Sequence, residues 1–184
     1  MFIQTEVTPN PNTLKFLPGR VVLENDTAFF TNIDECHNSP LAQSLFSIEG
    51  VAGVFFGSDF ITITKKPNSE WPILKPVALG AIMEHYESGK ELIIKTKSET
   101  PELKEEDSEI VKQIKELLET RVRPAVAMDG GDIVFQEYKN GIVYLNMQGA
   151  CSGCPSSTAT LKMGIENMLK HYVPEVKEVR PVNA

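Results

Sequence analysis

The sequence predicts an α+β protein built from two small domains. Three observations carry this prediction: β-prone runs mix with helical periodicities in both halves, a charged segment divides the halves, and an Asn-Gly pair marks a hairpin in the second half. A length of 184 residues suits one ordinary domain or two small ones. We expect domains over residues 1–95 and 108–184, joined by a flexible acidic linker over 96–107.

The first domain is expected to be a mainly antiparallel sheet with helices on one face. Ser39-Pro40 predicts a capping serine and a first-turn proline, and therefore the start of a short helix. Apolar pairs at four-residue intervals predict a longer helix over 71–87. Short β-prone runs predict strands over residues 2–7, 14–17, 28–31, 51–56 and 60–64.

The second domain is expected to follow the order helix, hairpin, helix, strand. Asn140-Gly141 is the strongest short hairpin signal in the chain. In Asp129-Gly130-Gly131-Asp132 we expect a sharp turn in which both glycines can take positive φ, with turn formation accounting for the two aspartates. The expected elements are a helix from 110 to about 124–128, strands over 133–138 and 142–147, a helix over 155–172 and a strand over 176–179.

Composition excludes several function classes. Eighteen Lys and Arg against 25 Asp and Glu give a net charge of −7, and no basic cluster is present, so we expect no nucleic-acid partner. No apolar run approaches the roughly 20 residues that span a bilayer, so no membrane partner is expected. The start has neither the apolar core of a signal peptide nor the character of a transit peptide. Three cysteines make no disulfide framework, which predicts a reduced, cytoplasmic protein.

The chemically informative feature is Cys151-x-x-Cys154, which is followed directly by Pro155 and a predicted helix. Two thiols at this spacing can turn toward one metal, as in zinc and iron–sulfur sites. A helix N-terminus lowers a thiol's pKa and favours anionic sulfur. We therefore expect Cys151 and Cys154 to be ligands rather than core residues.

Three chemical interpretations of the cysteine pair differ in the number of sulfur atoms that each requires. A dithiol oxidoreductase of the thioredoxin type needs two, but only about thirty residues follow Cys154, too few for that fold. Zinc or an iron–sulfur cluster usually needs four ligands. Cys36, beside His37, lies in the other predicted domain and could not complete a four-thiolate site. Four sulfurs would then require two chains across a two-fold axis.

The other candidates receive simpler explanations. Cys36-His37 lacks a third group, so a loop or partly buried thiol is expected there. His85 lies on the apolar stripe of its predicted helix, and His171 falls in the last turn of the other, where a cation suits the helix dipole. Trp71 is expected to open the long helix and to pack on the sheet.

Several segments resemble those of a known family. Residues 123–132, RPAVAMDGGD, and 149–157, GACSGCPSS, are similar to the C-terminal domain of NifU as found in Nfu-type proteins. Residues 8–16, TPNPNTLKF, resemble the N-terminal domain that accompanies it in bacterial and mitochondrial Nfu proteins. The resemblance covers essentially the whole chain, with an Nfu N-terminal domain over 1–95 and a NifU-like domain over 108–184.

The resemblance implies a carrier, not an enzyme. Members of the family hold a [4Fe–4S] cluster between two protomers and pass it to recipient apo iron–sulfur proteins. By position, the resemblance implies that Cys151 and Cys154 are the ligands in this chain. It also implies a homodimer on cluster binding and upstream assembly machinery as donor. Such a protein is cytoplasmic in a bacterium, which the N-terminal Met favours, or lies in the mitochondrial matrix as a processed eukaryotic form.

Overall fold

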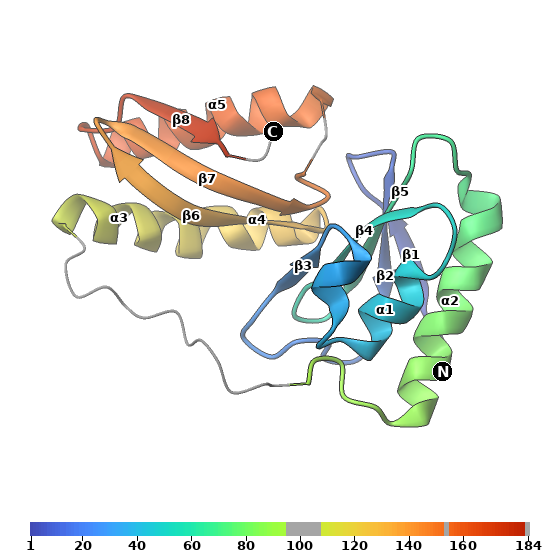
Figure 1. Cartoon of the computed structure of the whole chain (residues 1–184). Helices are drawn as coiled ribbons and strands as arrows, with labels where there is room; N and C mark the ends of the chain where they lie inside the picture. Colours follow the sequence, from blue (N-terminus) through green and yellow to red (C-terminus); the bar gives the residue numbers. More distant parts are fainter. Residues whose placement is uncertain (95–107, 153–154, 183–184) are drawn as a thin grey trace. The chain divides into compact units, whose positions relative to one another are not determined.

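The computed structural model describes residues 1–94, 108–152 and 155–182, the side chains of 155–158 excepted. The chain divides into two compact units, 1–98 and 99–184 (Figure 1). Both units mix helices and strands, so the predicted α+β class is confirmed. The predicted linker, 96–107, lies outside the described residues.

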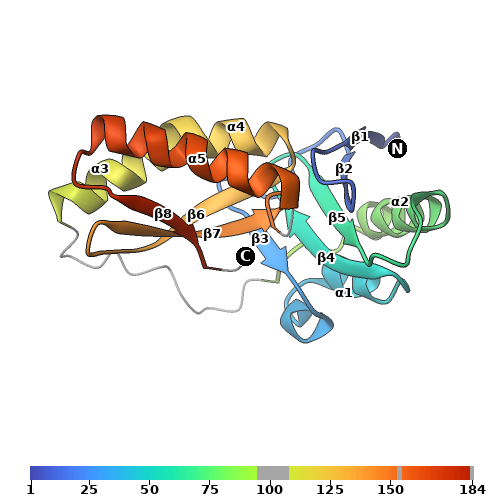
Figure 2. The same ribbon diagram turned by 90° about the horizontal axis from the view of Figure 1, so that it is seen from above.

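The first unit is a five-stranded sheet in which every neighbouring pair is antiparallel, in the order β1-β2-β5-β4-β3. Helices α1 and α2 pack on one face of this sheet and share a single apolar core with it (Figure 2). The strands are β1 (Gln4–Val7), β2 (Thr13–Leu17), β3 (Ala28–Phe30), β4 (Val51–Phe56) and β5 (Ile61–Lys65).

Helix α1 begins at the expected signal, and α2 ends at a glycine. The Ser39 side chain accepts a hydrogen bond from the N–H of Ala42, as a capping serine should. Gly89 ends α2 in the left-handed conformation, with φ of 65°. The helical elements are a 3₁₀ turn (Ile33–Cys36), α1 (Pro40–Phe46) and α2 (Trp71–Ser88).

The second unit has the predicted order of helix, hairpin, helix and strand. Strands β6 (Gly131–Lys139) and β7 (Ile142–Gly149) form an antiparallel hairpin across Asn140-Gly141, both with positive φ. Helix α5 (Pro155–Tyr172) then leads to β8 (Glu178–Pro181), which pairs parallel to β7. The sheet order is therefore β6-β7-β8.

The first helical region is not one uniform helix. It consists of α3 (Glu109–Leu117), a π-helical turn (Leu118–Val122) and α4 (Arg123–Met128). Pro124 has no N–H to donate, and its ring would collide with the carbonyl of Thr120 in a regular α-helix. A wider turn just before the proline removes that collision, which is a common reason for a π-bulge.

The last strand begins two residues later than the sequence predicted. Val176 is buried in the turn before it, where its N–H donates to the carbonyl of Val173. Pairing begins only at Glu178, opposite Ile142. The apolar character of Val176 reflects core burial from a turn, which sequence pattern does not separate from burial in a strand.

Candidate metal centre at the end of strand β7

Cys151 lies in a tight turn that follows β7. Gly149, at the end of that strand, has φ of 61°, which glycine adopts without strain. The turn is closed by backbone hydrogen bonds from Cys151 to the carbonyl of Gln148 (3.3 Å) and from Ser152 to that of Gly149 (3.1 Å). Ala150 donates to the carbonyl of Gly130 (3.1 Å), which ties the turn to the loop before β6.

Gly131 forms the floor beneath the Cys151 sulfur. A Cβ atom at position 131 would lie 2.4 Å from the Cys151 Sγ and 2.9 Å from its backbone nitrogen. Gly131 is the first residue of β6 and pairs with Gly149 of β7. The expectation of positive φ at both glycines is therefore correct for Gly130, at 80°, and wrong for Gly131. Gly131 is needed because the thiol occupies the space of a side chain.

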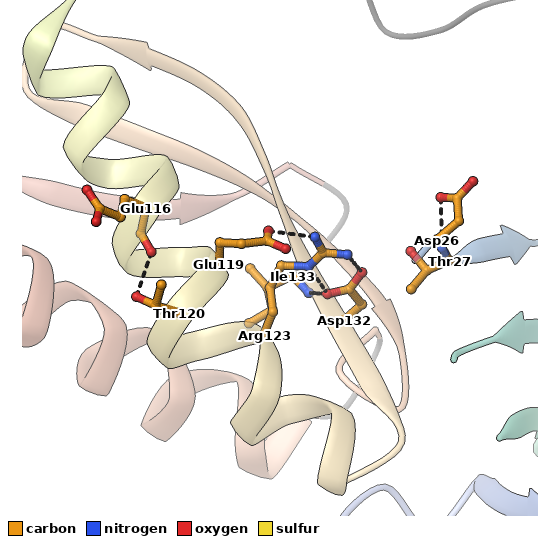
Figure 3. A network of polar contacts seen from close by, with 8 residues as sticks. All are labelled: Asp26, Thr27, Glu116, Glu119, Thr120, Arg123, Asp132 and Ile133. Carbon is orange, nitrogen blue, oxygen red and sulfur yellow. Dashed lines mark hydrogen bonds and ion pairs between the residues drawn. The ribbon is translucent and has the colours of Figure 1, made fainter. Parts of the chain in front are cut away.

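Asp132, next to Gly131, is not a turn residue as predicted but part of a buried ion pair. It is 3% exposed. Arg123 Nε and Nη2 each donate to one of its carboxylate oxygens at 2.9 Å, a bidentate arrangement (Figure 3). The backbone N–H of Ile133 donates to Oδ1 at 2.8 Å. The start of β6 is thus held to α4 by two hydrogen bonds from Arg123, and the third bond, from Ile133 within β6, fixes the orientation of the carboxylate.

Arg123 links this carboxylate to a second one. Its Nη1 donates to Glu119 Oε2 at 2.7 Å, one helical turn earlier. Hydrogen bonding to Asp132 is the largest of the influences that raise the pKa of Arg123, and Glu119 adds to it. Arg123 therefore stays a cation that joins the helical region to the strand carrying Gly131.

The structure describes only one of the two predicted ligands. Cys151 is 6% exposed and packs with the apolar core of its unit. Cys154 lies outside the described residues. Among residues 1–94, 108–152 and 159–182, no three His, Cys, Asp or Glu side chains come together as a metal site. In the same part of the chain, no helix is both long and apolar enough to cross a bilayer.

Cys36 occupies a different kind of environment. It is fully buried in the first unit, and its thiol donates to the carbonyl of Asn32 at 3.3 Å. Burial, with a smaller effect of Glu35, raises the pKa of Cys36 to about 11. Neighbouring His37 is exposed, and its Nδ1 lies 3.3 Å from the carbonyl oxygen of Asp34. Cys36 is therefore a protonated core thiol at neutral pH.

The remaining side chains singled out by sequence are not part of the Cys151 turn. His85 is buried on α2 against the Tyr86 ring, and burial followed by Lys90 lowers its pKa. His171 is exposed at the end of α5 and contacts Tyr172. Trp71 packs against the core at the start of α2, where its Nε1 donates to the carbonyl of Pro11 at 3.2 Å.

Sequence reasoning missed two residues that shape the turn. The sequence motif contains Arg123 without indicating its partner, and the turn prediction gives Gly131 only a conformational role. Nine positions separate Arg123 from Asp132, and 20 separate Gly131 from Cys151. No helical or strand periodicity connects such positions, so only the folded chain reveals these contacts.

The second unit is a small mixed α+β unit with a cysteine turn after β7, and comparison with known proteins specifies the family. The family model described as "Scaffold protein Nfu/NifU N terminal" matches residues 3–89. The family model described as "NifU-like domain" matches residues 114–180. The chain therefore belongs to the Nfu family of two-domain proteins.

Curated relatives match over nearly the whole chain. NifU-like protein 4, mitochondrial, of Arabidopsis thaliana is 55% identical over 97% of this chain and 65% of its own length. The protein named NFU1 iron-sulfur cluster scaffold homolog, mitochondrial, of Drosophila willistoni is 53% identical over 99% of this chain and 64% of its own length. The chain thus spans slightly less than two thirds of these relatives.

A solved structure also matches part of the chain. The solution NMR structure of a NifU-like protein from Saccharomyces cerevisiae is 32% identical and covers 52% of this chain and 87% of its own. The TM-score of that match is 0.48.

Proposed function

We propose that this protein is an iron–sulfur cluster scaffold and carrier. In this proposal, Cys151 and Cys154 of two chains hold one [4Fe–4S] cluster, which then passes to apo iron–sulfur proteins. The observation that carries the proposal is the Cys151 turn, whose sulfur rests on Gly131 in the space of a missing side chain. The Drosophila relative, named as an iron-sulfur cluster scaffold homolog, supports the same role.

The donor set fits a shared cluster. Each chain offers two thiolates at the Cys-x-x-Cys spacing, and a [4Fe–4S] cluster takes four. The cluster with four thiolates is anionic overall, and helix α5 begins at Pro155, directly after Cys154. The positive end of that helix dipole favours negative charge at this place. Two chains related by a two-fold axis would each supply half of the ligands.

Gly131 and the Arg123–Asp132 pair have positioning roles in this proposal. The ion pair holds the start of β6, and Gly131 in turn leaves room for the Cys151 side chain. In the described conformation Cys151 is only 6% exposed. Its thiolate therefore reaches a cluster shared with another chain when the turn 149–152 opens, so loading involves a local rearrangement.

A cluster between two chains also provides a route to release. Separation of the protomers leaves each chain with two ligands, and a recipient with four thiolates then holds the cluster more completely. The recipients are apo iron–sulfur proteins, and upstream assembly machinery supplies the cluster. The protein itself catalyses no bond-making step in this scheme and is a carrier rather than an enzyme.

The names of the two curated relatives place those proteins in mitochondria. That favours the mitochondrial matrix of a eukaryote for this protein over the bacterial cytoplasm. Fractionation of cells from the source organism, with detection of the native protein by antibody, distinguishes the two compartments.

Anaerobic reconstitution with iron and sulfide tests the proposal. We expect broad visible absorption, about four irons per two chains, and a light-scattering mass that doubles on loading, because the ligand set is complete only in the pair. Iron retained by a monomer would contradict the shared site. Colourless protein that reduces insulin disulfides would indicate a dithiol oxidoreductase, and stoichiometric zinc in the purified dimer would indicate a structural zinc site.

A further inference from the structure

Helix α2 is apolar on both of its faces. Its inner face buries Leu74, Ala78 and Ile82 in the core of the first unit. Its outer face exposes Ile73 by 72% and Val77 by 51%. In Figure 1 this helix, drawn in green, runs along the outside of its unit, with no other described element of that unit on its far side. A surface helix normally carries polar residues on such a face, so this one is suited to contact a partner.

The outer face has the spacing of a helix-packing surface. Six exposed residues recur at intervals of three and four along it, the pattern by which one helix packs against another. We call these six residues the α2 seam. They are Glu70, Ile73, Val77, Gly80, Glu84 and Glu87.

The middle of the seam is apolar and open to close approach. A Cβ atom at Gly80 would meet no other described atom within 4 Å, so no contact in the described part of the chain accounts for glycine there. Glycine in the interior of a helix is less favourable than alanine, because its backbone loses more conformational freedom on folding. On an exposed face, a missing side chain allows a second backbone to come near.

The two ends of the seam carry only negative charge. Glu70 stands at the N-terminal end, and Glu84 and Glu87 stand at the C-terminal end. None of the three forms an ion pair with another described residue. A hollow of about 450 Å³ adjoins the N-terminal end, with Glu49, Lys66, Glu70 and Ile73 among its lining residues. It offers room for a long side chain beside Ile73.

We propose that the α2 seam binds an amphipathic helix of another protein, with aliphatic residues at its centre and Lys or Arg at both ends. The apolar centre matches Ile73, Val77 and Gly80, and the basic ends match the unpaired carboxylates. This inference concerns the first unit and does not depend on how the cysteines bind iron.

The charges disfavour a second copy of this chain as the occupant. In an antiparallel pairing of two seams, Glu70 of one copy would face Glu84 and Glu87 of the other. In a parallel pairing, each glutamate would face its own counterpart. Both arrangements bring like charges together and leave them without partners. An anionic lipid surface meets the same repulsion.

Two synthetic helical peptides of about three heptads test this inference against the full chain. Both carry leucine at the seam-facing central positions, and they differ only in having lysine or glutamate at the positions that face the carboxylates. We expect the lysine peptide to bind with a Kd of tens of micromolar, at least about tenfold more tightly than the glutamate peptide, as suits a small interface. Fluorescence anisotropy measures the Kd of both peptides at two salt concentrations. Added salt should weaken the binding of the lysine peptide, because it screens the charges.

Variants locate the binding. Ile73→Asp combined with Val77→Asp should abolish binding of the lysine peptide, whereas Val21→Asp, at an apolar side chain 64% exposed elsewhere on this unit, should leave it unchanged. Circular dichroism checks that both variants are folded. Cluster loading at the cysteines should be the same in all three proteins, so a failure here is distinct from a failure of the carrier role.

Four outcomes would overturn the inference. Equal affinity for the two peptides would show that charge does not contribute to binding. If Val21→Asp lost as much binding as Ile73→Asp with Val77→Asp, the seam would not be the binding surface. Self-association of the metal-free chain in sedimentation runs, abolished by Ile73→Asp with Val77→Asp, would assign the seam to a second copy. Binding to phosphatidylglycerol vesicles with the same sensitivity would assign it to a membrane surface.

Discussion

The Cys36 and Cys151 segments begin alike and differ at one decisive position. In each, a buried cysteine stands four residues before the proline that opens a helix, Pro40 of α1 or Pro155 of α5. Before Pro40 stands Ser39, which accepts a hydrogen bond from Ala42 N–H and donates one to the carbonyl of Leu92 at 2.7 Å. Before Pro155 the sequence has Cys154.

This difference separates a core thiol from the proposed ligand pair. In the first segment the serine satisfies the helix N-terminus, and the lone thiol is buried with its pKa raised to about 11. In the second segment a second sulfur takes the serine's place in the sequence, beside the positive end of a helix dipole. Burial of a cysteine therefore says little about its function; the neighbouring residue and the helix terminus say more.

The largest expected effect comes from making the two segments alike. Cys154→Ser gives the second segment the Cys-x-x-Ser-Pro order of the first. We expect this variant and Cys151→Ser to lose the visible absorption and bound iron completely, because two sulfurs per pair of chains cannot hold the cluster. Cys36→Ala, the matched control, should load as the parent chain does. Equal loss in all three variants would overturn the assignment of ligands.

The next effect concerns the ion pair that supports only the second segment. Asp132→Ala should destabilise the second unit by about 3 kcal/mol, because it removes one member of a largely buried pair. Glu119→Ala, which removes the exposed partner of the same arginine, should cost less than about 0.5 kcal/mol. Thermal unfolding by circular dichroism measures both. Fluorescence of Trp71, the sole tryptophan, reports the first unit and should not change.

A smaller effect is expected at the close contact between Gly131 and Cys151. Gly131→Ala should destabilise the second unit by about 2 kcal/mol and lower cluster occupancy, because its Cβ would overlap the thiol and the turn backbone. Gly164→Ala, on the exposed face of α5 with no atom near its Cβ, should instead stabilise the unit by about 0.5–1 kcal/mol. If both substitutions stabilise the unit, the turn has more room than the contact distances indicate.

The last effect concerns Cys36 and appears only at alkaline pH. The pKa of its thiol is raised from 9.0 to about 11 by burial, so the folded state holds this proton more tightly than the unfolded state. The resulting stability is fully present below pH 9 and is lost as pH rises toward 11. The loss amounts to at most about 2–3 kcal/mol.

Urea titrations followed by Trp71 fluorescence measure this effect at several pH values. Cys36→Ala should be less stable at neutral pH, because it leaves a small cavity, and its stability should decline less between pH 9 and 11. Parallel declines in the two proteins would show that the Cys36 thiol does not titrate differently in the folded state.

Local sequence signals predicted most of the elements and the cysteine pair. Ser39-Pro40, Asn140-Gly141 and the helical rhythm after Trp71 each act through neighbours within a few residues. The same is true of Cys151-x-x-Cys154, whose spacing alone indicates a ligand pair. These signals do not depend on where distant parts of the chain lie, so they can be interpreted without a structure.

Only the tertiary structure decided what Gly131, Asp132 and Val176 do. The sequence suggested a flexible turn, a turn carboxylate and a strand, and the fold instead produced a floor for a thiol, an ion pair with Arg123 and a buried turn residue. Each of these roles depends on a contact with a residue that is not adjacent in sequence. Gly131 contacts Cys151, Asp132 pairs with Arg123, and Val176 donates to Val173. By itself the sequence determined which side chains can ligate metal. Packing determined how one of them is held, because excluded volume and buried charge act between residues that only folding brings together.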